Sequence, residues 1–122
     1  MIVLGKELPD LDVSDLETAQ KIDDFYAKYQ DAGNAVRDEQ NRVTIIKTVC
    51  SAVFNGFDSL FGAGTAKQMF GDKTNMRECV EAVKEITLAI KQAQNGLIAE
   101  INQMAKEMGS RADRRSAAKG KK

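Results

Sequence analysis

The chain has 122 residues, of which 43% are hydrophobic and 30% charged, and its 18 basic and 18 acidic side chains cancel to a net charge of zero. This length indicates one domain with an adequate core, although long helices have little depth, so we expect a partner to complete their burial. The lack of histidine removes the commonest general base and metal ligand.

Charge is distributed unevenly along the chain. Residues 1–42 carry ten acidic and five basic side chains, whereas residues 110–122 carry six basic side chains and one acidic. This asymmetry suggests electrostatic steering or head-to-tail association, with two solvated, solubilising ends as the alternative. The N-terminus has no signal-peptide pattern, and no uncharged apolar run approaches the ~20 residues of a membrane span. We therefore expect a soluble intracellular protein that makes no membrane contact.

The first predicted element is a β-hairpin over residues 2–8. Gly5 stands where a type II′ turn needs a positive φ, and Pro9 ends the ribbon. A ribbon this short is not stable alone, so it must dock on the helices or on another subunit.

A long helix is predicted over about 15–61, with Ser14 and Glu17 forming a capping box at its start. Gly33 could end one helix, with Asn34 beginning the next. Because the helical spacing continues through Gly33, we expect a continuous or mildly kinked helix instead. Apolar residues at steps of three and four, with only Glu39 out of pattern, define a first stripe: Ile22, Phe25, Tyr29, Ala32, Val36, Val43, Ile46, Cys50, Val53, Phe57 and Leu60.

Glycines divide the next segment. Gly62 is the predicted C-terminal cap of the long helix, and Thr65 is expected to cap a short helix over 66–70 that Gly71 ends. Asn75 then begins the last helix, predicted over about 76–108. Its apolar positions form a second stripe: Met76, Cys79, Val83, Ile86, Ile90, Ala93 and Leu97.

After Leu97 the apolar spacing slips. A slip of this kind turns the stripe around the helix, so its end no longer matches the first stripe. We expect this end, with the corner between the helices, to meet a partner. The predicted partner-binding residues are Ile101, Met104, Met108, Met69 and Phe70.

The predicted fold class is all-α: a long antiparallel helical hairpin with a short connecting helix and a small N-terminal β-hairpin. Residues 1–109 form a single helical domain, and residues 110–122 form a disordered basic tail. Electrostatic contacts are assigned to the basic residues of that tail, Arg111, Arg114, Arg115, Lys119, Lys121 and Lys122. The tail has no aromatic residue to stack on bases, so nucleic-acid binding is the least favoured use.

No combination of residues indicates catalysis. Cys50 and Cys79 fall on the stripes and are expected to be buried thiols, with a cross-link as an alternative that requires close Cα atoms. Gly62-Ala63-Gly64 follows a helix rather than a strand, which is not the setting of a phosphate loop. We expect a non-enzyme with no cofactor and no bound metal ion.

The segment from Phe57 to Gly71, followed by Asn75 to Cys79, resembles a family of small proteins from siphophages and prophages of Gram-positive bacteria. The specific feature is Phe-Gly-x-Gly-Thr, which here is Phe61 to Thr65. The N-terminal hairpin and the basic tail also resemble the family, although Asp113 replaces a neutral residue. The resemblance implies a product of the tail gene cluster, encoded near the tape-measure gene.

The resemblance also implies a function. Similar proteins are thought to act as tail assembly chaperones, so we expect binding to helical segments of the tape-measure protein, or of another tail protein, in the host cytoplasm. Two alternatives stay open. The chain could be a structural virion component or self-associating coiled coil, and thus a homo-oligomer, or a nucleic-acid accessory protein that acts through its basic tail.

Overall fold

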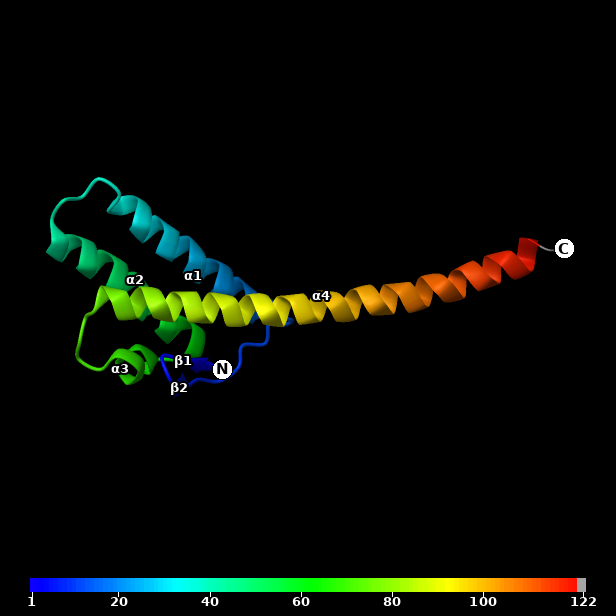
Figure 1. The fold of residues 1–122 in the computed structure, drawn as a ribbon, viewed down its shortest axis with the longest axis horizontal. Coiled ribbons are helices and arrows are strands. Elements are labelled where there is room, and N and C mark those ends of the chain that lie inside the picture. Colours follow the sequence, from blue (N-terminus) through cyan, green and yellow to red (C-terminus); the bar gives the residue numbers. More distant parts are fainter. Residues whose placement is uncertain (121–122) are drawn as a thin grey trace. The chain divides into compact units, whose positions relative to one another are not determined.

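A computed structural model describes the backbone of residues 1–120 and the side chains of residues 1–109. The predicted, mostly helical fold with a small N-terminal sheet is confirmed (Figure 1). The chain divides into a first unit, Met1–Ile90, and a second unit that starts at Lys91. The elements are β1 (Ile2–Val3), β2 (Lys6–Glu7), α1 (Leu16–Ala35), α2 (Arg42–Phe61), α3 (Thr65–Phe70) and α4 (Met76–Gly120).

The N-terminal hairpin is shorter than predicted and has a different turn. Strands β1 and β2 pair antiparallel, with Val3 opposite Lys6. The two turn residues, Leu4 and Gly5, have φ of 52° and 75°. Positive φ at both positions defines a type I′ turn rather than the expected type II′.

This hairpin docks on helices of its own chain. The Leu4 N–H donates to Glu85 Oε2 at 2.7 Å, and Val3 is fully buried. Lys6 Nζ donates to the carbonyls of Gln68 and Met69, at 3.0 and 2.8 Å, and so satisfies the C-terminal end of α3. Of the two docking modes expected from the sequence, the intramolecular one is the mode observed.

Helix α1 begins one residue later than the predicted capping box. Asp15 is the N-cap, and its Oδ2 accepts from the Thr18 N–H at 3.0 Å. Ser14 turns back instead and donates its hydroxyl and its N–H to Asp12. The first turn therefore uses a carboxylate cap, which the positive end of the helix dipole favours.

The prediction of one continuous helix over 15–61 is wrong. Gly33 lies inside α1, and the break falls at residues 36–41, after which Asn41 caps α2 by accepting from the Thr44 N–H at 3.1 Å. Glu39, the residue out of pattern, accepts from the Asn41 N–H at 2.9 Å. Residues 37–42 are all polar or charged, so they bury no stripe, and folding the chain back here lets α1 and α2 cover each other.

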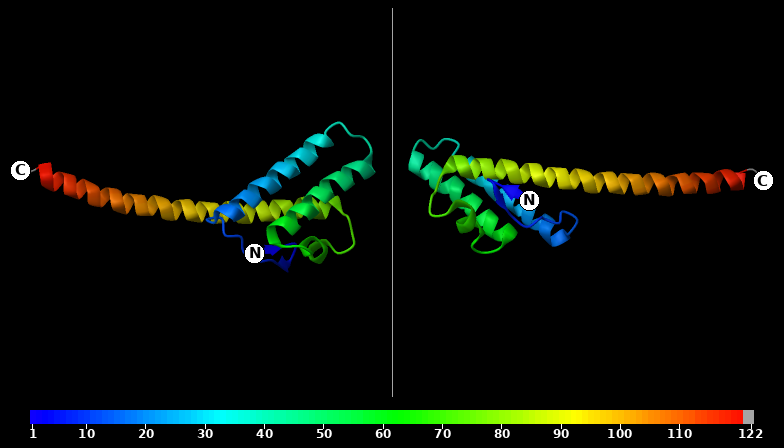
Figure 2. Two further views of the ribbon diagram at one scale, coloured as in Figure 1. Left: turned by 180° about the vertical axis from the view of Figure 1, so that it is seen from behind. Right: turned by 60° about the horizontal axis from the view of Figure 1, so that its bottom comes forward.

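Helices α1 and α2 lie side by side and antiparallel, as both views of Figure 2 show. Gly56 of α2 lies directly against the Phe25 ring of α1, since a Cβ atom built there would lie 1.9 Å from Phe25 Cδ2. The Phe25 ring also meets Phe57 edge-on, with centroids 6.3 Å apart. The helical hairpin of this fold is thus α1 with α2.

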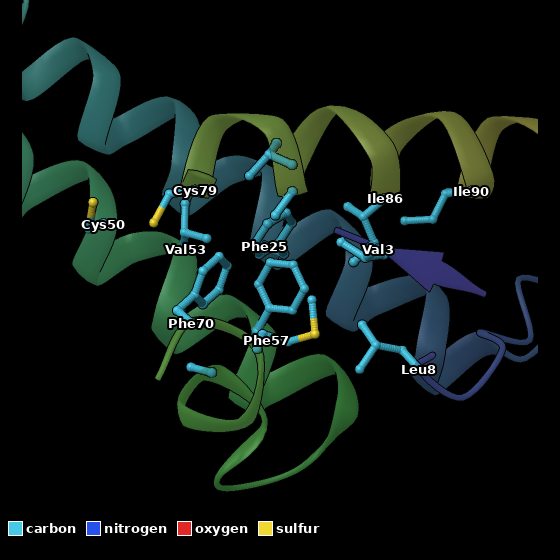
Figure 3. Close-up of a cluster of buried hydrophobic side chains, with 14 of the residues drawn as sticks. Val3, Leu8, Phe25, Cys50, Val53, Phe57, Phe70, Cys79, Ile86 and Ile90 are labelled. Carbon is cyan, nitrogen blue, oxygen red and sulfur yellow. The ribbon is translucent and has the colours of Figure 1, made fainter. Parts of the chain in front are cut away.

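Side chains from the β-hairpin, α1, α2, α3 and the first part of α4 together form the core of the first unit (Figure 3). Its largest fully buried side chains are those of Phe57, Ile22, Ile86, Val3, Val53, Cys50 and Cys79. The part of the second stripe from Cys79 to Ile90 therefore shares one buried cluster with residues of the first stripe.

The corner between α2 and α3 confirms two of its predicted caps and corrects the third. Gly62 and Gly71 follow α2 and α3 with φ of 113° and 64°. Thr65 is not a cap but the first residue of α3, and its hydroxyl donates to the Gly62 carbonyl at 2.7 Å. Asp58 supplies the missing acceptor, since its Oδ1 receives the Ala66 N–H at 2.8 Å.

Helix α4 begins as predicted but ends later. Asn75 Oδ1 accepts from the Glu78 N–H at 3.1 Å. The helix then continues through Gly120, so the prediction of disorder from residue 110 is wrong for residues 110–120, and residues 121–122 lie outside the described part. A glycine inside a helix, such as Gly109, costs only about 1 kcal/mol relative to alanine, and the Ala, Arg and Lys residues after it are strong helix formers.

Candidate helix-binding surface

The apolar side chains of α4 change from buried to exposed along the chain. Cys79, Ile86 and Ile90 are at most 2% exposed, in the core of the first unit. Within the second unit four large apolar side chains of α4 are instead more than half exposed: Ile98 (53%), Ile101 (55%), Met104 (61%) and Met108 (66%). With the half-buried Leu97 they make up what we call the exposed stripe.

The exposed stripe has a defined geometry. Steps of three or four residues link Ile98 to Met108, and Leu97 lies four residues before Ile101, which places all five on one side of the helix. The twelve residues from Leu97 to Met108 span about 18 Å at 1.5 Å per residue. Sequence reasoning identified Ile101, Met104 and Met108 but omitted Ile98, although Ile98 precedes Ile101 at the same helical spacing.

Polar residues border the exposed stripe on both edges. Glu100 and Glu107, seven residues apart, follow one edge, and Asn95 and Asn102, also seven apart, follow the other. All four side chains are exposed. We call these the acidic edge and the amide edge.

Met69 and Phe70 do not join this surface, which corrects their assignment to a partner-binding role. They are 3% and 6% exposed, and the centroid of the Phe70 ring lies 5.1 Å from that of Phe54 and 5.5 Å from that of Phe57. Hydrogen bonds from α3 to Lys6 and to Asp58 of α2 hold this short helix in place. The side chains of Met69 and Phe70 are therefore part of the core.

The predicted electrostatic contact residues lie outside the described side chains. They are Arg111, Arg114, Arg115, Lys119, Lys121 and Lys122. Their use for contacts therefore stays a prediction.

The two cysteines are free and buried, as expected, and come from α2 and α4 (Figure 3). Burial, followed by the neighbouring Cys50 thiol and the charge of Glu78, raises the pKa of the Cys79 thiol from 9.0 to about 12. A thiol that resists ionisation to this extent is a poor nucleophile.

The raised pKa of Cys79 predicts a stability change in alkali. Because the folded chain holds this proton more tightly, the stabilisation is complete below pH 9.0 and is lost as the pH rises towards about 12. In that window the free energy of unfolding should fall by up to about 1.4 kcal/mol per pH unit through this group. Urea unfolding of Cys79→Ala should show a shallower pH dependence, and equal slopes for variant and parent would contradict the assignment.

A hollow of about 370 Å³ lies between α1 and α2, lined by Tyr29, Gln30, Gly33, Asn34 and Val49. Burial, and then the nearby Cys79, raises the pKa of Tyr29, so no lining group ionises near neutral pH. Within the described residues no group of three or more metal-binding side chains gathers. The hollow offers shape but no acid, base or metal site.

None of the helices in the described part combines the length and the hydrophobicity that crossing a bilayer requires. Because its large apolar side chains are exposed, the exposed stripe is the candidate functional surface, with a chemistry of apolar contact between helices.

Comparison with known proteins gives one match. The model of a family of unknown function (DUF6673) matches residues 4–118, and the chain belongs to this family. No curated protein matches, and no solved structure matches.

Proposed function

We propose that this DUF6673 protein is a phage tail assembly chaperone that covers apolar helical segments of the tape-measure protein during tail morphogenesis. The observation that carries the proposal is the exposed stripe, where four large apolar side chains in succession are more than half exposed. Such a contiguous apolar surface marks a binding site more often than an ordinary solvated face.

The chemistry of the exposed stripe suits a reversible helical client. A tape-measure protein is a long helical chain whose bare apolar faces would aggregate, and an amphipathic helix covers such a face through contacts at the same spacing. Met104 and Met108 are unbranched and polarizable, so they adapt to differently shaped partners. A chaperone of this kind would act in the host cytoplasm, before the tail is complete.

The sequence resemblance supports the same proposal from another part of the chain. The motif Phe61 to Thr65 forms the corner between α2 and α3, where Gly62 and Gly64 have φ of 113° and 92°. These conformations favour glycine, so the motif has a structural reason to recur in related chains. The motif builds the fold, whereas the exposed stripe supplies the binding.

Self-association as a coiled coil is less well supported. The exposed stripe covers twelve residues, fewer than two heptads. Stable two-stranded coiled coils generally need at least about three heptads, and specific dimers bury upwards of about 1,200 Å². In the sequence the next position at this spacing is Arg111, which ends the apolar run. A surface this short fits transient binding better than a permanent homodimer.

Co-purification tests the proposal. Tagged chain expressed with the tape-measure protein of the same phage or prophage should retain it, and the chain should be absent from finished particles. The double variant Ile101→Asp with Met104→Asp should lose the tape-measure protein, because two carboxylates would enter the apolar contact. Finding the chain in mature tails at fixed stoichiometry would contradict the proposal.

Leu88 supplies the matched control. It is also on α4 and is 58% exposed, close to the 61% of Met104, but it lies off the exposed stripe. Leu88→Asp should leave retention of the tape-measure protein unchanged. Equal loss in Leu88→Asp and in the stripe variant would mean that added charge, rather than the exposed stripe, decides binding.

A further inference from the structure

The two edges of the exposed stripe differ in charge. Glu100 and Glu107 place carboxylates two helical turns apart along the acidic edge, whereas the facing positions of the amide edge hold Asn95 and Asn102. A helix that lies on the stripe must therefore set one of its own flanks beside two negative charges.

A second copy of the chain satisfies this requirement poorly. In an antiparallel pair like edges meet, so Glu100 would face Glu107 of the second copy, and this repulsion would occur twice. In a parallel pair Glu100 would face Ala105 of the second copy, which carries no charge. Neither arrangement gives the acidic edge a cation among the described side chains.

We propose that the exposed stripe recognises an amphipathic helix that carries Lys or Arg residues seven apart along one flank of its apolar face. The inference rests on the proposed function and names the class of client segment. The apolar contacts supply the binding, and the pairs with Glu100 and Glu107 select the client and fix its direction on the stripe.

Two synthetic helical peptides test the inference. They share one apolar face and differ at two flanking positions seven apart, which carry Lys in one peptide and Glu in the other. In fluorescence anisotropy with the full chain, the Kd of the Lys peptide should be about threefold to tenfold lower than that of the Glu peptide. This difference is what two exposed ion pairs are expected to contribute. Raising the salt from about 0.05 M to about 0.5 M should remove most of this difference by screening.

Charge-neutralising variants locate the effect. Glu100→Gln with Glu107→Gln should bring the Kd values of the two peptides together. The control, Asp31→Asn with Asp72→Asn, removes the same charge from exposed positions in α1 and in the turn after α3, and it should preserve the preference. Equal affinity of the unchanged chain for both peptides, or equal effects of the two double variants, would overturn the inference.

The outcomes separate the two proposals. Suppose that both peptides bind the unchanged chain equally and that neither binds the Met104→Asp variant. The inference of charge selection is then wrong, while the helix-binding function stands. If neither peptide binds, the inference falls, and retention of the tape-measure protein decides the proposed function independently.

Discussion

Replacing Gly56 with alanine is expected to destabilise the first unit by about 2–4 kcal/mol, or to prevent its folding. The new Cβ would lie 1.9 and 2.1 Å from Phe25 Cδ2 and Cε2, far inside van der Waals contact. Phe25 is 2% exposed and also packs on Phe57, so the ring has no free space to move into. Thermal unfolding followed by circular dichroism should show a fall in Tm of more than about 10 °C.

Gly33 provides the control for Gly56. It also lies inside a helix, but a Cβ there would meet nothing within 4 Å. Gly33→Ala should raise stability by about 0.5–1 kcal/mol, because alanine is the better helix former. In a Phe25→Ala background, Gly56→Ala should lose most of its effect, since the clash is removed. Equal destabilisation with and without Phe25 would contradict the close approach of α1 and α2.

Val53→Asp is the second change with a large expected effect. Val53 is fully buried among side chains of the first unit's core, so an aspartate there would leave a carboxylate without a partner. We expect a loss of at least about 4 kcal/mol and a largely unfolded chain at neutral pH. The measurement is the helical circular dichroism signal at 222 nm and its urea midpoint.

The same substitution at Val43 should be tolerated. Val43 is 59% exposed and is the second residue of α2, where a carboxylate favours the helix dipole. Val43→Asp should change stability by no more than about 0.5 kcal/mol. The two residues stood on the same predicted stripe, so a large loss at Val43 would mean that the stripe is buried further than the structure indicates.

The helix caps are the part of the fold that the sequence predicts best. Asn75, Gly62 and Gly71 are caps in the structure because capping depends on residues within one turn. The break between α1 and α2 was missed because Val36 and Val43 keep a spacing of seven across a loop. Heptad spacing alone does not show whether the residues between two apolar positions form a helix with a buried side. Here residues 37–42 are all polar or charged, so a helix through them would have no apolar side to bury.

The surface could be predicted only in part, for a related reason. Helical spacing identified Ile101, Met104 and Met108, which are exposed as a binding surface requires. Met69 and Phe70 have the same apolar character, but tertiary contacts bury them, among them the hydrogen bond that the Ala66 N–H of α3 donates to Asp58 of α2. Gly56 gave no sequence signal, since its role depends on which ring the other helix places against it.

The hydrogen bond from Leu4 to Glu85 joins positions 81 residues apart, and it has a consequence for the order of folding. The β-hairpin leaves the ribosome before α4 does, so its acceptor Glu85 is made much later than Leu4. Helices α1 and α2 can pair as soon as Phe61 has emerged, because their contacts are local. The hairpin is therefore synthesised before its partner on α4, and the burial of Val3 is completed only after Glu85 has been made.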